Sequence, residues 1–593
     1  MITTATPTIN IHPLRCADFA TLAQALDYAA QGVTGYNFYD GRGKLSAVLS
    51  DAELRRRALA TAKRLHGLGL RRGERVALIA ETSPEFMEFF YACQYGGFVP
   101  VPLPITINLG SRESYIERLR RLLYSCAPAA AMAPAEFLAF LQEAANGIDG
   151  LRKVASPEEF YALDEPAVQL DPSGPDDIAY LQYTSGSTRF PRGVVITQKA
   201  VMANLAGIVG PGLGVRSGDR CVSWLPFYHD MGLVGFVLGP LASQLSVDYL
   251  GTRDFAMRPR QWLSLLSNNQ GTIAFSPPFG YDICARRVHQ TEISRYDLSS
   301  WRVAGVGAET VYAETLERFA DFLAPAGFSR RAFLPCYGLA ESSLAVSFAA
   351  LDQGILVDHV DRRALEGHMR ASVIAPEPGR GERVSAFVNC GRPLPGHEVI
   401  VRDDDGKPLP YRHVGVVSVK GPSLMSGYFR DAVSTHVALG RDGWLNTGDL
   451  GYLTEAGLFI TGRCKDLIIV NGRNIWPQDM ERLAEEQPEV RVGDVTAFVA
   501  THPQGGEVVV MLVQCRLTED TRRADLVSRL QRMIYGEFGI NCRIELVPPK
   551  TLPRTSSGKL SRAEARRRFV QCVGWDRPNE EAIADAPKAV ASG

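Results

Sequence analysis

Strands that alternate with helices constrain this chain more than any other feature of its sequence. RVALIAE (75–81), SPEFMEFFYACQYGG (83–97) and VPVPLP (99–104) are typical of a strand, a helix and a strand in succession. Ser83 can cap the helix, and the Gly96–Gly97 pair can end it. Alternation of this kind predicts an α/β fold with largely parallel sheets.

The same alternation continues along the chain. ESYIERLRRLLYSCAP (113–128) has the pattern of a helix whose apolar residues share one face, namely Tyr115, Ile116, Leu119, Leu122, Leu123 and Cys126. A Pro- and Asp-rich stretch, LDEPAVQLDPSGPDD (163–177), is typical of a linker. After it, IAYLQYT (178–184), VVIT (194–197) and QKAVMANLAGIV (198–209) predict two strands and a helix.

The length of 593 residues exceeds what one hydrophobic core usually serves, so at least two domains are expected. Past residue 385, short strands with turn signals indicate a small β-barrel-like subdomain. After residue 465, the sequence predicts a small α+β domain with a long amphipathic helix, ADLVSRLQRMIYGEF (524–538). We therefore predict a large N-terminal domain (1–464) of doubly wound α/β subdomains and a small C-terminal domain (465–593), with a disordered tail from about residue 577.

Composition excludes several classes of function. The net charge is −1 without runs of like charge, which argues against nucleic-acid binding. The eleven cysteines form no CxxC pair, which favours free thiols in a reducing compartment over disulfides or zinc. No basic-then-apolar leader is visible at the start, and no apolar run is long enough to span a membrane. These features predict a cytoplasmic protein.

One polar loop separates two predicted strands. YTSGSTRFPRGVV (183–195) combines hydroxyl side chains, glycines and two arginines. Glycines let a backbone approach a ligand closely, while hydroxyls and arginines can donate to phosphate oxygens. The GxxxxGK[ST] spacing of nucleotide triphosphatases is absent. Composition alone leaves two interpretations open, a phosphate-binding loop and an ordinary surface turn.

Other stretches accompany this loop in a fixed order. They are WLPFYHDMGL (224–233), GVGAE (305–309), YGLAES (337–342), GWLNTGDLG (443–451), GRCKDLIIVNGRNIWPQDME (462–481) and PRTSSGKLSR (553–562). With them, the chain from about residue 40 to 570 resembles the adenylate-forming superfamily, which includes acyl-CoA synthetases, luciferases and peptide-synthetase adenylation domains. In that family the polar loop cradles the β- and γ-phosphates of ATP.

The details resemble one branch, the fatty acyl-AMP ligases. Most of the superfamily has Gly where Arg189 stands and Lys where Arg192 stands. HDMGL (229–233), SPPFGYDICARR (276–287) and VNGRNIWPQD (470–479) also resemble this branch. The resemblance implies that ATP and Mg²⁺ activate a fatty acid as its adenylate, which is passed to a separate acyl carrier protein rather than to CoA. The alternatives are a fatty acyl-CoA synthetase and a non-catalytic acyl-adenylate binding protein.

By resemblance, nucleotide-binding residues lie in the polar loop and in four of the accompanying motifs. They are Thr184, Ser185, Gly186, Ser187, Thr188, Arg192, Gly307, Ala308, Glu309, Tyr337, Gly338, Leu339, Ala340, Asp449 and Arg463. Tyr337 would stack on the adenine, Asp449 would accept from the ribose hydroxyls, and Arg463 would donate to the ribose or phosphate. Taken alone, Asp449 would be an ordinary turn residue.

The resemblance also assigns three catalytic residues. Lys559 would neutralise the α-phosphate and the carboxylate, and Glu341, joined by Thr184, would hold Mg²⁺. His229 would contact the substrate, because a carboxylate needs no general base at neutral pH. Without the motifs, Lys559 would be a solvated lysine and Glu341 a helix-start glutamate favoured by the dipole. Lys465 would be the hinge of the small domain.

An acyl chain also requires an apolar tunnel. The apolar stretches after the reactive-site motifs suggest a set of substrate-binding residues, namely Asp230, Met231, Phe236, Phe279 and Tyr281. Plain core packing is the competing interpretation of these stretches.

Two further features bear on the acceptor. The segment 351–384 is longer than a connecting loop needs to be and resembles an insertion that fatty acyl-AMP ligases carry. Its apolar residues could anchor it to the body of the domain. The arginines of KLSRAEARRRF (559–569) form either a solvated helix face or a docking patch for an acidic carrier protein, namely Arg562, Arg566, Arg567 and Arg568.

Overall fold

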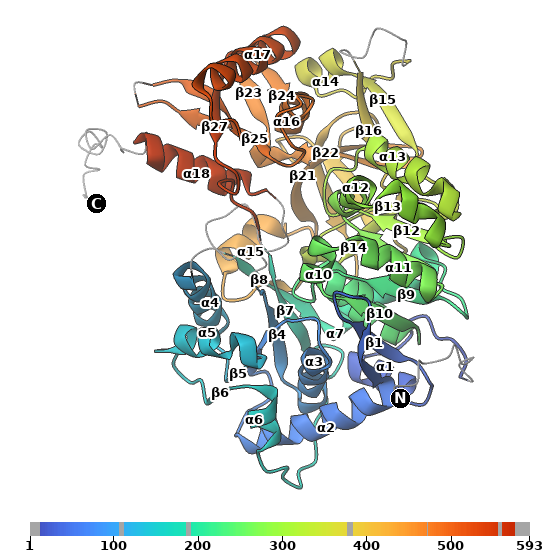
Figure 1. Ribbon diagram of the computed structural model, residues 1–593. Coiled ribbons are helices and arrows are strands. Elements are labelled where there is room, and N and C mark those ends of the chain that lie inside the picture. The colour runs from blue at the N-terminus through green and yellow to red at the C-terminus, as the bar shows by residue number, and fades with distance from the viewer. Residues whose placement is uncertain are drawn as a thin grey trace, which may run out of the picture. The chain divides into compact units, whose positions relative to one another are not determined.

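The computed structural model describes residues 12–105, 112–184, 191–375, 384–470, 472–503, 505–555 and 560–575 (Figure 1). The chain divides into two compact units, Met1–Gly462 and Arg463–Gly593. This division falls two residues before the boundary expected from the sequence. The predicted disordered tail lies outside the described residues, and within them no helix is long and apolar enough to cross a membrane.

The large unit is organised around a nine-stranded sheet of order β17-β14-β13-β12-β11-β9-β10-β1-β2 (Figure 1). The strands from β13 to β1 in this order pair in parallel, and antiparallel strands flank them on both sides. In sheet order, their bounds are Arg392–Pro393, Ala345–Phe348, Phe333–Gly338, Val303–Val306, Ile273–Ser276, Arg220–Ser223, Ser246–Leu250, Gly35–Tyr39 and Leu45–Ser50. The prediction of an α/β fold with largely parallel sheets is therefore confirmed.

A second sheet of the large unit has the order β4-β3-β5-β6 and is parallel throughout. Its strands are Val99–Leu103, Arg75–Ile79, Ala130–Met132 and Lys153–Ala155. Helix α3 (Pro84–Gly96) joins β3 to β4, with the Ser83 hydroxyl accepting from the Phe86 amide and Gly97 left-handed at φ +67°. Helix α4 (Arg112–Cys126) buries all six residues of the predicted apolar face.

The strands on either side of the polar loop depart from the parallel pattern. β7 (Ile178–Thr184) and β8 (Arg192–Thr197) pair antiparallel, and β20 (Gly427–Tyr428) adds to β8. The physical reason is length, because a parallel pair needs a crossover of about a dozen residues or more. β7 and β8 are therefore an antiparallel pair, with Thr184 opposite Arg192.

The remaining helices of the large unit mostly cover these sheets (Figure 1). They are α1 (Leu22–Ala29), α2 (Asp51–Gly67), α5 (Ala135–Ala145), α6 (Pro157–Tyr161), α7 (Gln198–Gly207), α8 (Asp230–Gly232), α9 (Gly239–Ala242), α10 (Thr252–Met257), α11 (Arg260–Asn268), α12 (Pro278–Arg287), α13 (Ala313–Leu323), α14 (Arg362–His368) and α15 (Ala432–Ala438).

The predicted β subdomain is a four-stranded sheet of order β18-β19-β21-β22. Its strands are Glu398–Arg402, Gly415–Lys420, Leu445–Thr454 and Gly457–Arg463. The pairs β18–β19 and β19–β21 are antiparallel.

The segment 351–384 is folded where it is described. β15 (Val357–Asp361) pairs antiparallel with β16 (Val384–Val388), and helix α14 follows β15 directly. Val360 and Leu365 are fully buried, whereas Leu356 is exposed. Asp358 accepts from Arg412 Nη1 at 3.0 Å and from the Tyr452 hydroxyl at 2.8 Å, which joins the segment to the β subdomain.

The small unit has its own hydrophobic core around Ile468, Met511, Leu526 and Ile534. A three-stranded sheet, β25 (Val495–Thr501), β26 (Glu507–Gln514) and β27 (Cys542–Val547), packs with α16 (Pro477–Glu485), α17 (Asp520–Phe538) and α18 (Arg562–Val573). A short hairpin, β23 (Ile468–Val470) and β24 (Arg473–Ile475), precedes α16. These elements confirm the predicted α+β character and the long amphipathic helix.

A buried carboxyl group in the large unit gives a pH-dependent prediction. Asp51, at the start of α2, is 1% exposed, and burial raises its pKa from 3.8 to about 6 although the Thr34 hydroxyl donates to it. The ionised form therefore destabilises the native state, fully above pH 6 and not at all below pH 3.8. Asp51→Asn should raise the melting temperature at pH 8, and the difference from wild type should vanish near pH 4. An equal gain at both pH values would contradict this account.

Candidate active site

The structure describes the polar loop 183–195 only at its two ends. Thr184 ends β7 and Arg192 begins β8, whereas Ser185, Gly186, Ser187 and Thr188 lie outside the described residues. The Arg192 guanidinium carbon lies 5.1 Å from the centroid of the Tyr428 ring. Its Nε is 3.9 Å from Asp431 Oδ2, a distance at the limit of an ion pair.

Glu341 lies close to this hairpin. The Tyr428 hydroxyl, on the strand that pairs with β8, donates to Glu341 Oε1 at 2.8 Å. Burial and the neighbouring Glu341 carboxylate raise the pKa of Tyr428, so its hydroxyl stays protonated. Sequence analysis did not identify Tyr428, because nothing in GYFR (427–430) signals contact with a residue 87 positions away.

The oxygen atoms near Glu341 suit a hard cation that takes only a few of its ligands from the protein. Carboxylate and hydroxyl oxygens are ligands that Mg²⁺ accepts, and Mg²⁺ typically keeps one or two carboxylates together with substrate phosphates and waters. Within the described ranges no cluster of three or more His, Cys, Asp or Glu side chains could hold a metal. The Glu341 carboxylate and the Thr184 hydroxyl are oxygen donors of the kind that Mg²⁺ accepts.

The ribose and adenine candidates meet in the structure. The Tyr337 hydroxyl donates to Asp449 Oδ2 at 2.7 Å, and both side chains are buried. TGD lies within β21 and not in a turn, at a register shift between β19 and β21 where Gly448 is left-handed at φ +72°. The Thr447 hydroxyl accepts from the Asp449 amide at 3.1 Å, and this irregular part of the strand places the Asp449 carboxylate against the Tyr337 hydroxyl.

GVGAE and YGLA follow neighbouring strands. β12 and β13 are parallel with Val306 opposite Pro335, so their carboxyl ends lie at one edge of the sheet, where α/β proteins bind ligands. A Cβ at Gly307 would lie 2.8 Å from the Cys336 carbonyl oxygen, and Ala308 is left-handed at φ +68°. The edge therefore brings two sets of candidates together. Just after β12 are Gly307, Ala308 and Glu309, and at the end of β13 and just beyond it are Tyr337, Gly338, Leu339 and Ala340.

His229 belongs to a tightly bonded turn before α8. Its Nδ1 lies 2.6 Å from Asp230 Oδ1, which also accepts from the Met231 amide at 2.7 Å. The Gln182 side-chain amide on β7 donates to the Tyr228 carbonyl oxygen at 2.7 Å. The turn is thereby fixed to the strand that ends at Thr184.

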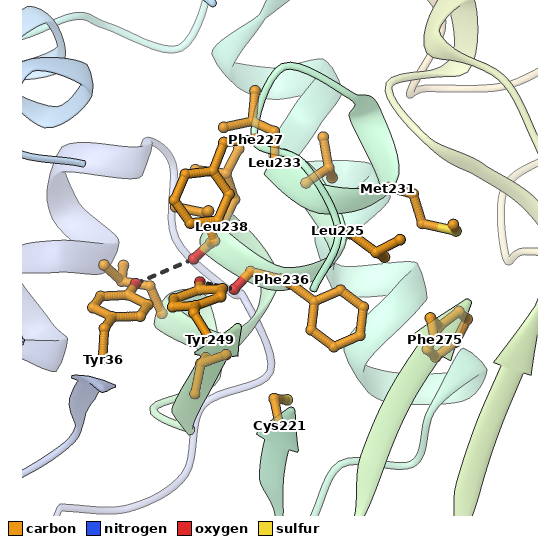
Figure 2. Packing of buried hydrophobic residues seen from close by; sticks show 14 of the residues in the cluster. Tyr36, Cys221, Leu225, Phe227, Met231, Leu233, Phe236, Leu238, Tyr249 and Phe275 are labelled. Carbon is orange, nitrogen blue, oxygen red and sulfur yellow. Dashed lines mark hydrogen bonds between the residues drawn. The ribbon is translucent and has the colours of Figure 1, made fainter. Parts of the chain in front are cut away.

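The apolar candidates have two different environments. Met231 and Phe236 are buried beside the parallel sheet, with the Phe236 ring 5.8 Å from that of Phe275 (Figure 2). Phe236 lies in a π-helical turn (Leu233–Leu238), a conformation found frequently at functional sites. Phe279 is half-buried, with its ring 5.7 Å from that of Trp224.

Tyr281 has the surroundings of a core residue. It is fully buried, and its ring contacts those of Trp262, Trp301, Phe319 and Phe333. Its hydroxyl donates to the Gly305 carbonyl oxygen at 2.8 Å. These contacts are those of a side chain that packs α12 against β12.

The small unit carries the remaining candidates. Arg463 and Lys465 are exposed, and Lys559 lies outside the described residues. Arg562 does not belong to an exposed docking patch, because its guanidinium bonds Asp466 Oδ2 at 2.6 Å and Glu481 Oε2 at 2.8 Å. The exposed Arg567 and Arg568 both bond Glu564, which removes part of the expected positive charge.

Known proteins are similar to this chain over most of its length. The model of the family described as AMP-binding enzyme matches residues 42–429. A proposed acyl-CoA synthetase of Caulobacter vibrioides is 44% identical over 95% of this chain and 98% of its own length. The medium-chain-fatty-acid–acyl-carrier-protein ligase JamA of Moorena producens is 31% identical over 93% of this chain and 96% of its own.

A solved structure shares the fold. It comes from structural and functional studies of fatty acyl-adenylate ligases from E. coli and L. pneumophila, and it superposes with a TM-score of 0.90 at 51% identity. The match covers 95% of this chain and all of the other. The chain belongs to the AMP-binding enzyme family and is an adenylate-forming ligase.

Proposed function

We propose that this ligase converts a fatty acid and ATP into fatty acyl-AMP and pyrophosphate, and then transfers the acyl group to the phosphopantetheine of a separate acyl carrier protein. The Tyr337–Asp449 hydrogen bond beside the carboxyl ends of β12 and β13 carries the proposal, because it joins an aromatic ring to a buried acceptor at a ligand-binding edge. The similarity to JamA and to the fatty acyl-adenylate ligase structure supports the substrate and the acceptor.

In this mechanism the chain positions two anions against each other. Tyr337 and the turn at Gly307 would hold the adenine, and Asp449 would accept from the ribose hydroxyls. Glu341 and Thr184 would hold Mg²⁺, which supplies charge neutralisation at the phosphates when bound. His229 would contact the acyl carboxylate, and Met231 and Phe236 would line the acyl site. Lys559 would neutralise charge as the carboxylate attacks the α-phosphate.

The choice of acceptor is the point at which a second function competes. The similarity to the proposed acyl-CoA synthetase of Caulobacter supports CoA as the acceptor, whereas the similarity to JamA supports a carrier protein. The segment 351–384, which the Asp358 contacts anchor to the β subdomain, supports the carrier protein, because such an insertion would restrict the conformations that receive CoA.

A two-stage assay tests the proposal. The protein is incubated with ATP, Mg²⁺, hydroxylamine and a panel of fatty acids, and hydroxamate formation reports the adenylate. CoA and a phosphopantetheinylated carrier are then offered separately. The proposal requires that hydroxamate forms and that the carrier protein becomes acylated, whereas little acyl-CoA is made. Comparable yields on CoA would establish the competing acyl-CoA synthetase activity, and no hydroxamate with any fatty acid would refute the substrate.

The ribose contact gives a quantitative prediction. Asp449→Ala should raise the KM for ATP more than that for the fatty acid, because losing a buried polar partner costs roughly 1–3 kcal/mol. Tyr337→Phe is the matched control, since it removes the same hydrogen bond but leaves the carboxylate, and it should have a smaller effect. Unchanged nucleotide affinity of the alanine variant in calorimetry would remove Asp449 from the proposed nucleotide site.

A further inference from the structure

Arg118 on helix α4 is a half-buried cation to which no described carboxylate is bonded. Among the described residues, its electrostatic neighbours are the Tyr228 and Tyr115 hydroxyls, and burial lowers the pKa of its guanidinium. By contrast, Arg120 and Arg121 on the same helix bond Glu117 at 3.1 and 2.7 Å. A charge withdrawn from water without an opposite charge is unfavourable, so folding alone does not explain this arginine.

Arg118 lies one helical turn after a residue that marks the carboxyl edge of a parallel sheet. The Tyr115 hydroxyl donates to the carbonyl oxygen of Pro104, just past the carboxyl end of β4, at 3.2 Å. In the order β4-β3-β5-β6, the direction of the connections reverses between β3 and β5, one strand away from β4, and ligands of α/β sheets bind outside the carboxyl ends of strands at such a reversal.

Tyr228 connects Arg118 to the candidate active site. It is buried, it precedes His229, and its carbonyl oxygen accepts from Gln182 on the strand that ends at Thr184. Arg118 interacts electrostatically with the Tyr228 hydroxyl, so Tyr228 links it to the turn proposed to contact the acyl carboxylate and, through Gln182, to β7.

We propose that Arg118 binds a phosphate group of a ligand that enters beside the Tyr228–His229 turn. The planar guanidinium offers paired donors that match phosphate oxygens, and a ligand phosphate would supply the missing negative charge. This inference rests on the proposed function, which brings two phosphate-bearing species to the large unit. They are pyrophosphate derived from ATP and the phosphopantetheine of the carrier protein.

Binding measurements test the proposal without turnover. Inorganic pyrophosphate and phosphopantetheine are titrated separately into the wild type, Arg118→Gln and Arg118→Lys by calorimetry. Arg121→Gln is the control, because it removes an exposed arginine from the same helix. The Kd of at least one ligand should rise about tenfold or more in Arg118→Gln, less in Arg118→Lys, and not in the control. The ligand that weakens identifies the source of the phosphate.

Stability provides a second readout. A cation kept for binding rather than folding should be replaceable by an apolar side chain, so Arg118→Met should melt at or above the wild-type temperature. The proposal is overturned if both Kd values stay within about twofold of wild type, if the wild type binds neither ligand, or if Arg118→Met melts well below wild type. If Arg118→Gln weakens ligand binding but the wild type forms no hydroxamate, the proposed fatty-acid activity is refuted and the phosphate-binding role of Arg118 is not.

Discussion

Replacing Lys559 with alanine is expected to lower the rate of adenylate formation by about 10²–10³ while ATP still binds. The reaction joins a carboxylate to a phosphate, so a cation matters most where the two negative charges converge. Such a contact is stronger in the transition state than in the ground state, and its loss should therefore lower kcat rather than raise the KM for ATP.

Pyrophosphate release with a fixed fatty acid measures this effect. Arg566→Ala is the matched control, because Arg566 is an exposed cation on the nearby helix α18. Lys559→Arg should keep part of the rate, since the arginine side chain retains the positive charge but differs in shape from lysine. Near-normal release by the alanine variant would remove Lys559 from the proposed mechanism.

Replacing Arg562 with methionine should lower the stability of the small unit by about 3–5 kcal/mol, because breaking a buried ion pair leaves uncompensated charge. Burial opposes the charge of Arg562, but Glu481 and Asp466 outweigh it and raise the pKa of the guanidinium. Glu481 also accepts from the Ala497 amide of β25 at 2.9 Å, so the arginine joins α18 to Asp466 and to the sheet.

Urea unfolding monitored by limited proteolysis of the small unit checks this prediction. Arg567→Met is the control on the same helix, because its partner Glu564 is three residues away and such surface pairs contribute only about 0–1 kcal/mol. Equal loss of stability in the two variants would show that Arg562 acts only as another surface charge.

Local features of the fold could be predicted from the sequence, because they depend on neighbouring residues. The Ser83 cap and the buried face of α4 follow from spacing within one helix. The antiparallel pairing of β7 with β8 was not predicted, although the short connection between Thr184 and Arg192 contains the signal. Alternation of strands and helices indicates parallel sheets on average, and one hairpin is an exception to it.

The candidate site was predictable only as a set of motifs. The motifs identify Asp449 and Tyr337 separately, but 112 positions separate the partners of their hydrogen bond. Other hydrogen bonds likewise join distant parts of the chain. Tyr428 bonds Glu341, and Arg562 bonds Asp466 and Glu481. Periodicity also cannot distinguish an acyl-site aromatic from the core packing seen around Tyr281.

The separate core of the small unit has a consequence for recombination between related ligases. Ile468, Met511, Leu526 and Ile534 pack together within Arg463–Gly593, and the Arg562 network closes inside the same boundaries. A crossover at Gly462–Arg463 would therefore transplant this core together with the Arg562 network. Chimeras made there should fold, and they would separate the properties that travel with the small unit from those, such as the anchored segment 351–384, that stay with the large one.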